Sequence, residues 1–287
     1  MMNYSKLIEE RVSSRAFKDK PVPAKATDEL LAYYKNGAAR LFPGIETELV
    51  IAGTKDREKL ERAAGYNEFL IGAPQYLILL SEDAPYAAIN AGYLMEDLAL
   101  KLQELSCGAC FITFADSSRI KEALSISSGK TVAAILAFGI PTPVRKKIHV
   151  NILTMSNVIV KGGKSYFAPK KSVGELTYFD SYGCRDSLEE RLDHYGDALR
   201  EPLHAASLAP SYMNCQPYSF LIKDHKVFLI GEQNDLTPAA DYDLNLGVVL
   251  LHFTSVLEDY VGKVTWAFDE ELTGLPGGTK QIAYCEI

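Results

Sequence analysis

The sequence has few cysteines, no long hydrophobic run and no excess of basic residues, and each absence excludes a class of protein. The five cysteines among 287 residues form an odd set without the spacing of a disulfide framework or a zinc site. The longest apolar stretch, residues 132–140, is far shorter than the roughly 18 residues that span a bilayer. The first ten residues lack the apolar region of a signal peptide. We therefore expect a reduced, soluble, cytoplasmic protein.

The charge balance argues against a nucleic-acid partner. The chain has 30 Lys and Arg against 37 Asp and Glu, a net charge of −7, with an isoelectric point near 5.4. A polyanion needs a broad positive field, which this balance does not supply. Hydrophobic residues make up 47% of the chain, enough for a packed globular core. We expect binding of a small molecule or a protein, with any anion held by a local basic cluster.

The pattern of apolar residues predicts the same order of elements twice. The first half is expected to contain helices over 28–40 and 87–105 and strands over 47–51, 75–80, 109–114 and 131–140. The second half is expected to contain a helix over 188–208 that Pro202 interrupts, a helix over 243–260, and strands over 218–222, 227–230, 264–268 and 281–287. Both halves therefore follow the order α-β-β-α-β-β.

This repetition predicts the fold class and the domain organisation. Each half has too few buried faces to be stable alone, so we expect the two halves to pack together. The prediction is one α+β domain of 287 residues, in which helices surround antiparallel or mixed sheets. Its halves are residues 1–141 and 187–287, and a polar connector, residues 142–186, joins them.

Two guanidinium groups and a hydroxyl alternate near the N-terminus. In an extended chain Arg11, Ser13 and Arg15 point to one side, where they would meet a single anion. Arginine forks bind phosphate oxygens in pairs, and a serine hydroxyl donates a further hydrogen bond. On spacing alone, a solvated tail with scattered charges is the simpler interpretation.

A second segment, residues 209–218, places small polar residues between two prolines. Ser211, Asn214 and Gln216 carry hydroxyl and amide groups that can bind the edge of a polar planar ring. The alternative is an ordinary turn between a helix and a strand, because proline, serine and asparagine are common in turns.

Together the two segments resemble the nitroreductase family of FMN enzymes. The family's R-x-S-x-R/K-x-F segment, followed by D-x-P-V, is similar to residues 11–17 and 19–22. Its A-P-S-x-x-N-x-Q-P-W signature is similar to residues 209–218, with Tyr218 in place of tryptophan. Residues 104–111, 137–141 and 169–176 resemble further family segments, so the resemblance covers nearly the full length.

The resemblance implies a nitroreductase-like sandwich and a set of FMN ligands. The phosphate would be bound by Arg11, Ser13, Arg15, Lys170 and Lys171. The ring would lie against Pro210, Ser211, Tyr212, Asn214 and Gln216, with the backbone near Thr113 at its N5 side. Lys170 and Lys171 are equally well explained as part of a solvated connector.

One departure from the family pattern concerns the position of the ring segment. In ordinary members this segment follows the arginine segment closely, and each flavin lies between two subunits. Here residues 40–47 lack the motif, which occurs instead in the second half. The sequence thus resembles a fused, degenerate dimer, and we expect a monomeric chain that binds one FMN.

The resemblance further implies an oxidoreductase that uses NAD(P)H as co-substrate. Hydride would pass by a ping-pong mechanism through flavin N5 to an electron-poor acceptor (nitroaromatic, quinone or enone), without a catalytic side chain. One alternative is a flavin-binding or sensing protein with little turnover. Another is a thiol–disulfide enzyme using Cys107 and Cys110. No metal is expected, because the histidines lack ligand spacing, and Leu124 replaces the glycine that a phosphate loop would need before Ser128–Thr131.

Overall fold

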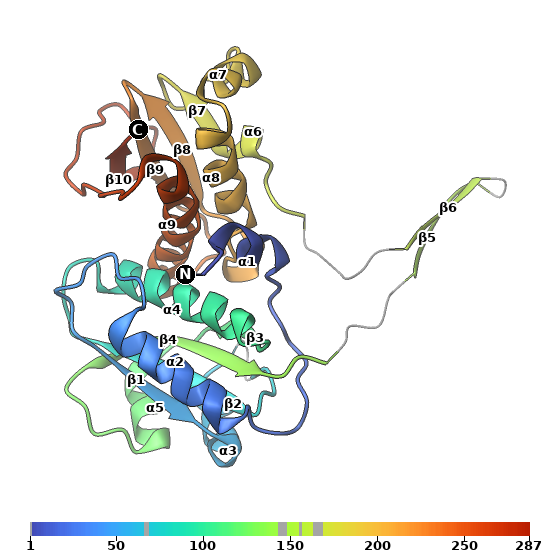
Figure 1. The fold of residues 1–287 in the computed structure, drawn as a ribbon, viewed down its shortest axis with the longest axis vertical. Helices are drawn as coiled ribbons and strands as arrows, with labels where there is room; N and C mark the ends of the chain where they lie inside the picture. Colours follow the sequence, from blue (N-terminus) through green and yellow to red (C-terminus); the bar gives the residue numbers. More distant parts are fainter. Residues whose placement is uncertain (1, 66–68, 143–147, 155–156, 163–168) are drawn as a thin grey trace.

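The chain folds into two lobes that meet at a pair of long helices (Figure 1). The computed structural model describes residues 2–65, 69–142, 148–154, 157–162 and 169–287. Each lobe is built around a four-stranded sheet, and helices pack on the sheets. The predicted α+β class, with helices around antiparallel and mixed sheets, is confirmed.

The first lobe contains an antiparallel sheet with the strand order β1-β2-β4-β3. Its strands are β1 (Thr47–Ala52), β2 (Gln75–Ser81), β3 (Gly108–Ile112) and β4 (Thr131–Gly139). Its other elements are α2 (Ala24–Asn36), η1 (Thr54–Asp56), α3 (Arg57–Leu60) and α5 (Ser117–Leu124). Because successive side chains of a strand alternate, Leu77 packs with Leu30 of α2 while Ile78 packs with Leu60 and Ile120 of α3 and α5.

The second lobe contains a mixed sheet with the strand order β10-β9-β8-β7. Its strands are β7 (Thr177–Phe179), β8 (Tyr218–Lys223), β9 (Lys226–Glu232) and β10 (Thr279–Glu286), and only β7 and β8 run parallel. Its helices are α6 (Val173–Leu176), α7 (Leu188–Tyr195), α8 (Asp197–Leu208) and η2 (Tyr212–Asn214). The connector also contains an antiparallel pair, β5 (Ile148–Thr154) and β6 (Asn157–Gly162).

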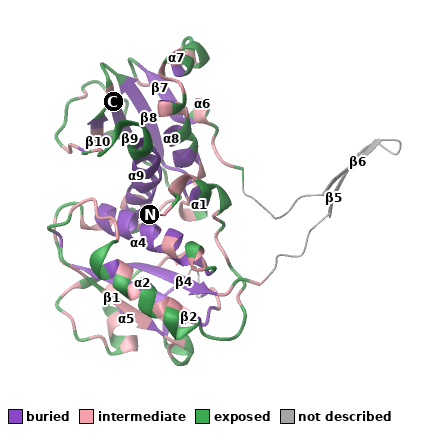
Figure 2. Ribbon diagram, viewed as in Figure 1, coloured by how far each residue is buried: buried purple, intermediate pink, exposed green. Residues whose placement is uncertain are grey.

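Helices α4 (Ala87–Glu104) and α9 (Ala239–Val261) cross at the boundary of the lobes and are mostly buried (Figure 2). They touch through two glycines. A Cβ on Gly92 would lie 2.1 Å from the carbonyl oxygen of Leu244, and a Cβ on Gly247 would lie 1.9 Å from that of Ile89. Helix α9 is long and apolar enough to cross a membrane, but 78% of its apolar window is buried inside the protein. It is therefore a core helix of a soluble fold.

The N-terminal arm, residues 11–17, leaves helix α1 (Tyr4–Glu10) as an extended strand-like segment. It runs along the first sheet, where Ser13 forms a bridge with Ala109 and Phe17 forms one with Pro141. The Ser14 N–H donates to the Ala109 carbonyl at 3.0 Å. The arm is therefore extended, as we expected from the alternation of Arg11, Ser13 and Arg15.

Three sequence predictions need correction. The helix expected over 188–208 is broken at Gly196 (φ 62°, ψ −152°), a conformation that favours glycine, whereas Pro202 lies inside α8. The strand expected over 264–268 is reduced to one bridge between Ala267 and Tyr284. Helices α2 and α9 each begin about one turn earlier than predicted, directly after Pro23 and Pro238, because proline at a helix start is compatible with the helix.

Candidate functional site

A pocket of about 280 Å³ lies where the arm, β3, the loop before β8 and the start of α9 meet. Two segments that are far apart in the sequence therefore face one cavity. The predicted site residues that line it are Ser13, Arg15, Thr113, Pro210, Ser211 and Tyr212. Of these, Arg15 is exposed and makes no hydrogen bond or ion pair within the described part of the chain, so its guanidinium is available to a ligand.

Behind the arm, Arg11 belongs to a buried charged cluster. Its Nε lies 2.7 Å from Glu96 Oε1, and its side chain is only 6% exposed. His252 Nε2 lies 2.8 Å from the same oxygen, while its Nδ1 faces the Ala205 carbonyl at 3.0 Å. The Arg11 Nη2 is buried without a hydrogen-bond partner in the described residues. The Arg11 Nε, although it is paired by charge with the Glu96 carboxylate of α4, has no hydrogen-bond partner in the described residues either.

A second, half-buried cation, Lys170, lies close to this cluster. Its Nζ donates to the Ala209 carbonyl at 2.8 Å. Burial, and then the positive charge of Arg11, lower the pKa of Lys170 to about 8, while Glu96 acts in the opposite direction. Two cations thus lie near a single carboxylate. Such a cluster is suited to an additional anion.

The loop before β8 is held in a backbone conformation that few side chains adopt. Met213, Asn214 and Gln216 all have positive φ values (46°, 60° and 43°). The Asn214 amide donates to the Pro169 carbonyl at 2.7 Å, and the Gln216 N–H donates to Ser211 Oγ at 2.9 Å. These contacts fix the shape of the loop around the pocket.

Asn214, Gln216 and Lys171 do not line the pocket, contrary to their expected positions beside a ligand. Arg11, which lines a separate cavity, and Lys170 do not line it either. The buried Gln216 amide donates to the Ser207 carbonyl at 2.9 Å and accepts from the Lys171 N–H at 2.8 Å. The Lys171 Nζ donates to the Gln216 carbonyl at 2.9 Å and pairs with Glu232 at 3.1 Å. Their side chains are used to join the connector to the loop.

The start of α9 contributes two polar residues that the sequence analysis missed. Asp241 accepts a hydrogen bond from Thr113 Oγ1 at 2.6 Å, and burial raises the pKa of its carboxyl. Asn245 accepts from the Tyr212 N–H at 3.1 Å, and its buried Nδ2 has no partner in the described residues. A signal was present, because the pattern [I/L]-N-x-G occurs in both α4 and α9, at residues 89–92 and 244–247.

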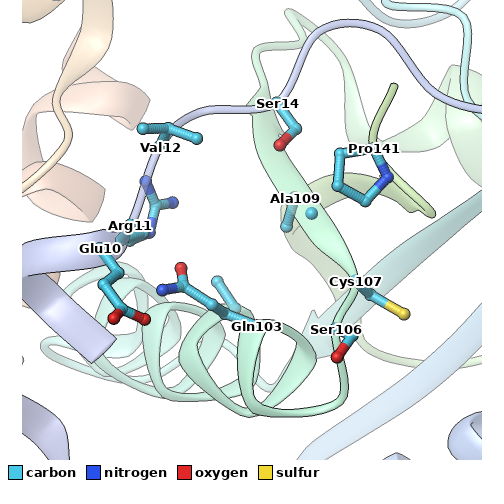
Figure 3. Close-up of a pocket in the computed structure, with 11 residues that line it drawn as sticks. Glu10, Arg11, Val12, Ser14, Gln103, Ser106, Cys107, Ala109 and Pro141 are labelled. Atoms are coloured by element: carbon cyan, nitrogen blue, oxygen red, sulfur yellow. The ribbon is translucent and has the colours of Figure 1, made fainter. Parts of the chain in front are cut away.

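A separate cavity of about 250 Å³ lies on the other side of the arm, against the C-terminal end of α4 (Figure 3). Ser14 and Cys107 line it, whereas Ser13 and Cys110 line the first pocket. The two cysteines therefore lie on opposite sides of the strand. Burial raises the pKa of both thiols, which disfavours the reactive thiolate. This arrangement does not favour a dithiol redox centre.

Comparison with known protein families places the chain in one of them. A family described as "Putative TM nitroreductase" matches residues 3–256. The chain belongs to this nitroreductase family. No curated protein sequence matches the chain significantly.

One solved structure supports the same fold for this family member, and two others share a weaker similarity. The chain is similar to a "putative nitroreductase" from Thermotoga maritima MSB8, with 14% identity over 99% of this chain and 94% of that chain (TM-score 0.58). An FMN-dependent nitroreductase from Clostridium difficile R20291 shares 20% identity over 48% of this chain and 88% of its own (TM-score 0.41). An iodotyrosine deiodinase bound to FMN and 3-iodo-L-tyrosine shares 20% over 54% and 98%, respectively (TM-score 0.42).

Proposed function

We propose that the chain is an FMN-dependent oxidoreductase that binds one flavin in the pocket between the arm and the loop before β8. The observation that carries this proposal is the meeting of Ser13 and Arg15 with Ser211 and Tyr212 at one cavity. In the family these two segments supply the phosphate end and the ring end of the flavin site. Membership of a nitroreductase family supports the same assignment.

The residues in and next to the pocket fit this cofactor. Arg15 lines the pocket and offers an exposed guanidinium to a phosphate. Next to the pocket, the unpartnered Arg11 Nη2 and the cation Lys170 add positive charge. The buried Asn245 Nδ2 offers an amide donor to an acceptor atom on a polar ring. Leu244 and Val248 supply apolar surface for the flat face of the ring.

The chemistry assigned to the chain's own residues is binding and orientation. FMN, when bound, supplies hydride transfer from NAD(P)H to an electron-poor acceptor. Phe69 and Met213, which are 71% and 65% exposed, lie at the pocket and offer apolar surface to a planar acceptor. This surface suits a nitroaromatic, a quinone or an enone. We further propose the cytoplasm as the compartment, because the thiols are free and buried or half-buried in the described structure.

The phosphate assignment is tested by Arg15→Ala. Arg15 has no other partner in the described structure, so we expect the variant to fold normally and to bind FMN at least tenfold more weakly. Adding Arg11→Ala should strip FMN from the purified protein, but this change also leaves Glu96 without its buried cation. Flavin fluorescence quenching measures both affinities. The control is Lys20→Ala, which changes an exposed lysine three residues after the arm. Unchanged FMN affinity in Arg15→Ala would show that the phosphate lies elsewhere.

A flavin-binding or sensing protein with little turnover is the second candidate. The hydrogen bond between Asp241 and Thr113 and the strained loop before β8 define the shape of the pocket. Neither feature indicates a particular acceptor, which favours this candidate. Anaerobic mixing of the flavin-loaded protein with NADH or NADPH separates the two functions. Rapid bleaching of the flavin absorbance supports the oxidoreductase, whereas persistent colour with tightly held FMN supports the binding protein.

A further inference from the structure

The two sheets share a strand order and an irregularity. Strands β1, β2 and β4 follow one another in the first sheet as β8, β9 and β10 do in the second, and every one of these neighbouring pairs is antiparallel. A bulge lies at the same place in both. Leu79 and Leu80 of β2 pair with Ala134 and Val132 of β4, so residue 133 has no partner on β2. Leu229 and Ile230 of β9 pair with Ala283 and Gln281 of β10, so residue 282 has no partner on β9. A shared bulge is a specific sign that β4 and β10 are counterparts.

The contact between α4 and α9 is consistent with the same correspondence between the two lobes. Gly92 packs on the carbonyl of Leu244, and Gly247 packs on the carbonyl of Ile89. These two contacts exchange when α4 and α9 are exchanged, which is the signature of a twofold relation. The counterparts are therefore Gly92 and Gly247, and Ile89 and Leu244.

Superposing the two glycines pairs Asn90 with Asn245. Asn245 accepts from the backbone N–H of Tyr212 at 3.1 Å, and Asn90 accepts from that of Phe42 at 2.9 Å. Both side-chain Nδ2 atoms are buried without a partner in the described structure. This duplication of an unusual polar environment identifies Phe42 as the counterpart of Tyr212.

Two further counterparts follow from helix position and strand register. Tyr86 precedes Asn90 as Asp241 precedes Asn245, by one helical turn. Ile112 pairs with Ile135, which lies two residues after the bulge at residue 133. Ala267 pairs with Tyr284, which lies two residues after the bulge at residue 282. Phe268 is therefore the counterpart of Thr113.

The counterparts of the pocket residues make contact with one another. Thr113 and Asp241 form a hydrogen bond at the open pocket. Their counterparts Phe268 and Tyr86 have ring centroids 4.8 Å apart, and Phe42 lies 5.3 Å from Tyr86 and 4.7 Å from Phe268. We infer that these three rings close a second binding position, related to the open pocket by an internal twofold, so that the chain has one usable site of two.

The closed position would take the planar ring of a ligand but not its phosphate. The arm bridges β3 at Ala109, whereas no segment in the described part of the chain bridges residue 264 in the second lobe. The arginines of the arm therefore have no counterpart at the second position. An uncharged flavin ring without phosphate, lumiflavin, is the appropriate probe, and this choice of probe rests on the proposed function.

The variant Tyr86→Asp/Phe268→Thr tests the inference by installing the residue pair of the open pocket. Phe42 is retained, because its counterpart Tyr212 is also aromatic. Wild type and variant are first saturated with FMN, and lumiflavin is then added up to its solubility limit in equilibrium dialysis. We expect one FMN per chain in both proteins, and one more lumiflavin per chain in the variant than in wild type. Tyr178→Ala/Tyr182→Ala, which removes a ring pair at 4.7 Å in the second lobe, is the control and should bind no more lumiflavin than wild type.

The possible outcomes separate the inference from the proposed function. A folded variant that binds no more lumiflavin than wild type overturns the inference. A wild type without FMN affinity overturns the proposed function, while the difference in lumiflavin between variant and wild type still decides the inference. If circular dichroism shows that the variant is unfolded, Tyr86→Ala/Phe268→Ala, which introduces no charge, takes its place.

Discussion

Asp97 is a fully buried carboxylate in α4, away from the pocket residues. Its two oxygens accept hydrogen bonds from Tyr4 and Tyr33 hydroxyls at 2.7 and 2.9 Å and from the Ala39 N–H at 2.8 Å. Burial raises the pKa of Asp97 to about 6, although these hydrogen bonds act in the opposite direction. The folded protein thus binds this proton more tightly than the unfolded chain does. The resulting stabilisation is complete below pH 4 and is lost as the pH rises through about 6.

Asp97→Asn should remove this pH dependence. We compare the free energy of unfolding of the variant minus that of wild type. We expect this difference to rise by roughly 3 kcal/mol as the pH increases from 4 to 6, and to stay constant above pH 6. The lost acceptor adds a pH-independent offset, because an amide oxygen cannot replace both carboxylate oxygens. Urea denaturation at several pH values measures the difference. Asp83→Asn, on the exposed surface, serves as the reference. A difference that does not change with pH would rule out Asp97 as the titrating group.

At the level of residues, the sequence predicted features that depend on neighbouring residues and missed contacts between residues that are far apart in the chain. The alternation of Arg11, Ser13 and Arg15 correctly predicted an extended arm, because an extended conformation is a local property. It did not predict that Ser13 and Arg15 line one pocket while Arg11 lines another. The partnership of Arg11 with Glu96 joins two distant elements, and nothing near either residue indicates it. Asn214 and Gln216 were assigned to a ligand from their donor groups and from the family resemblance. In the structure their side-chain amides donate instead to the backbone carbonyls of Pro169 and Ser207.

The contact of α4 with α9 shows how closely two helices can pack when each has a glycine. Gly92→Ala would place a methyl group against a backbone carbonyl that cannot rotate away. We expect the helices to separate and the free energy of unfolding to fall by about 3 kcal/mol. Chemical denaturation measures this loss. Gly129→Ala is the matched control, since no atom lies within 4 Å of its Cβ position, and a similar loss in both variants would contradict the packing argument.

At the level of elements, most helices and strands were predicted, and the errors concern their boundaries and a few short elements. Periodicity defined β1, β2, β4 and α4 almost to the residue, because each has a continuous apolar face. Proline misled the boundaries, since Pro202 is tolerated within α8 while Gly196 ends α7. Strand β7 was missed within the connector, because its three residues are too few for a periodic pattern.

The site as a whole is built from both lobes of one chain, which has a consequence for dilution. A flavin held between two separate subunits is lost when the subunits dissociate, whereas a site within one chain is independent of protein concentration. We expect a monomer of 31.7 kDa that keeps one FMN per chain on dilution. Light scattering after gel filtration measures the mass, and flavin absorbance measures the content. A dimer that releases FMN as it dissociates would contradict a site contained in one chain.

The pairing of Thr113 with Phe268 shows what a single chain permits. In a homodimer one codon specifies both copies of a position, so a bulky ring that blocks one cavity blocks its twin as well. When both positions belong to one polypeptide, each is encoded separately. One cavity can then be filled to strengthen the core while the other stays accessible, and selection can act on each position independently of its counterpart.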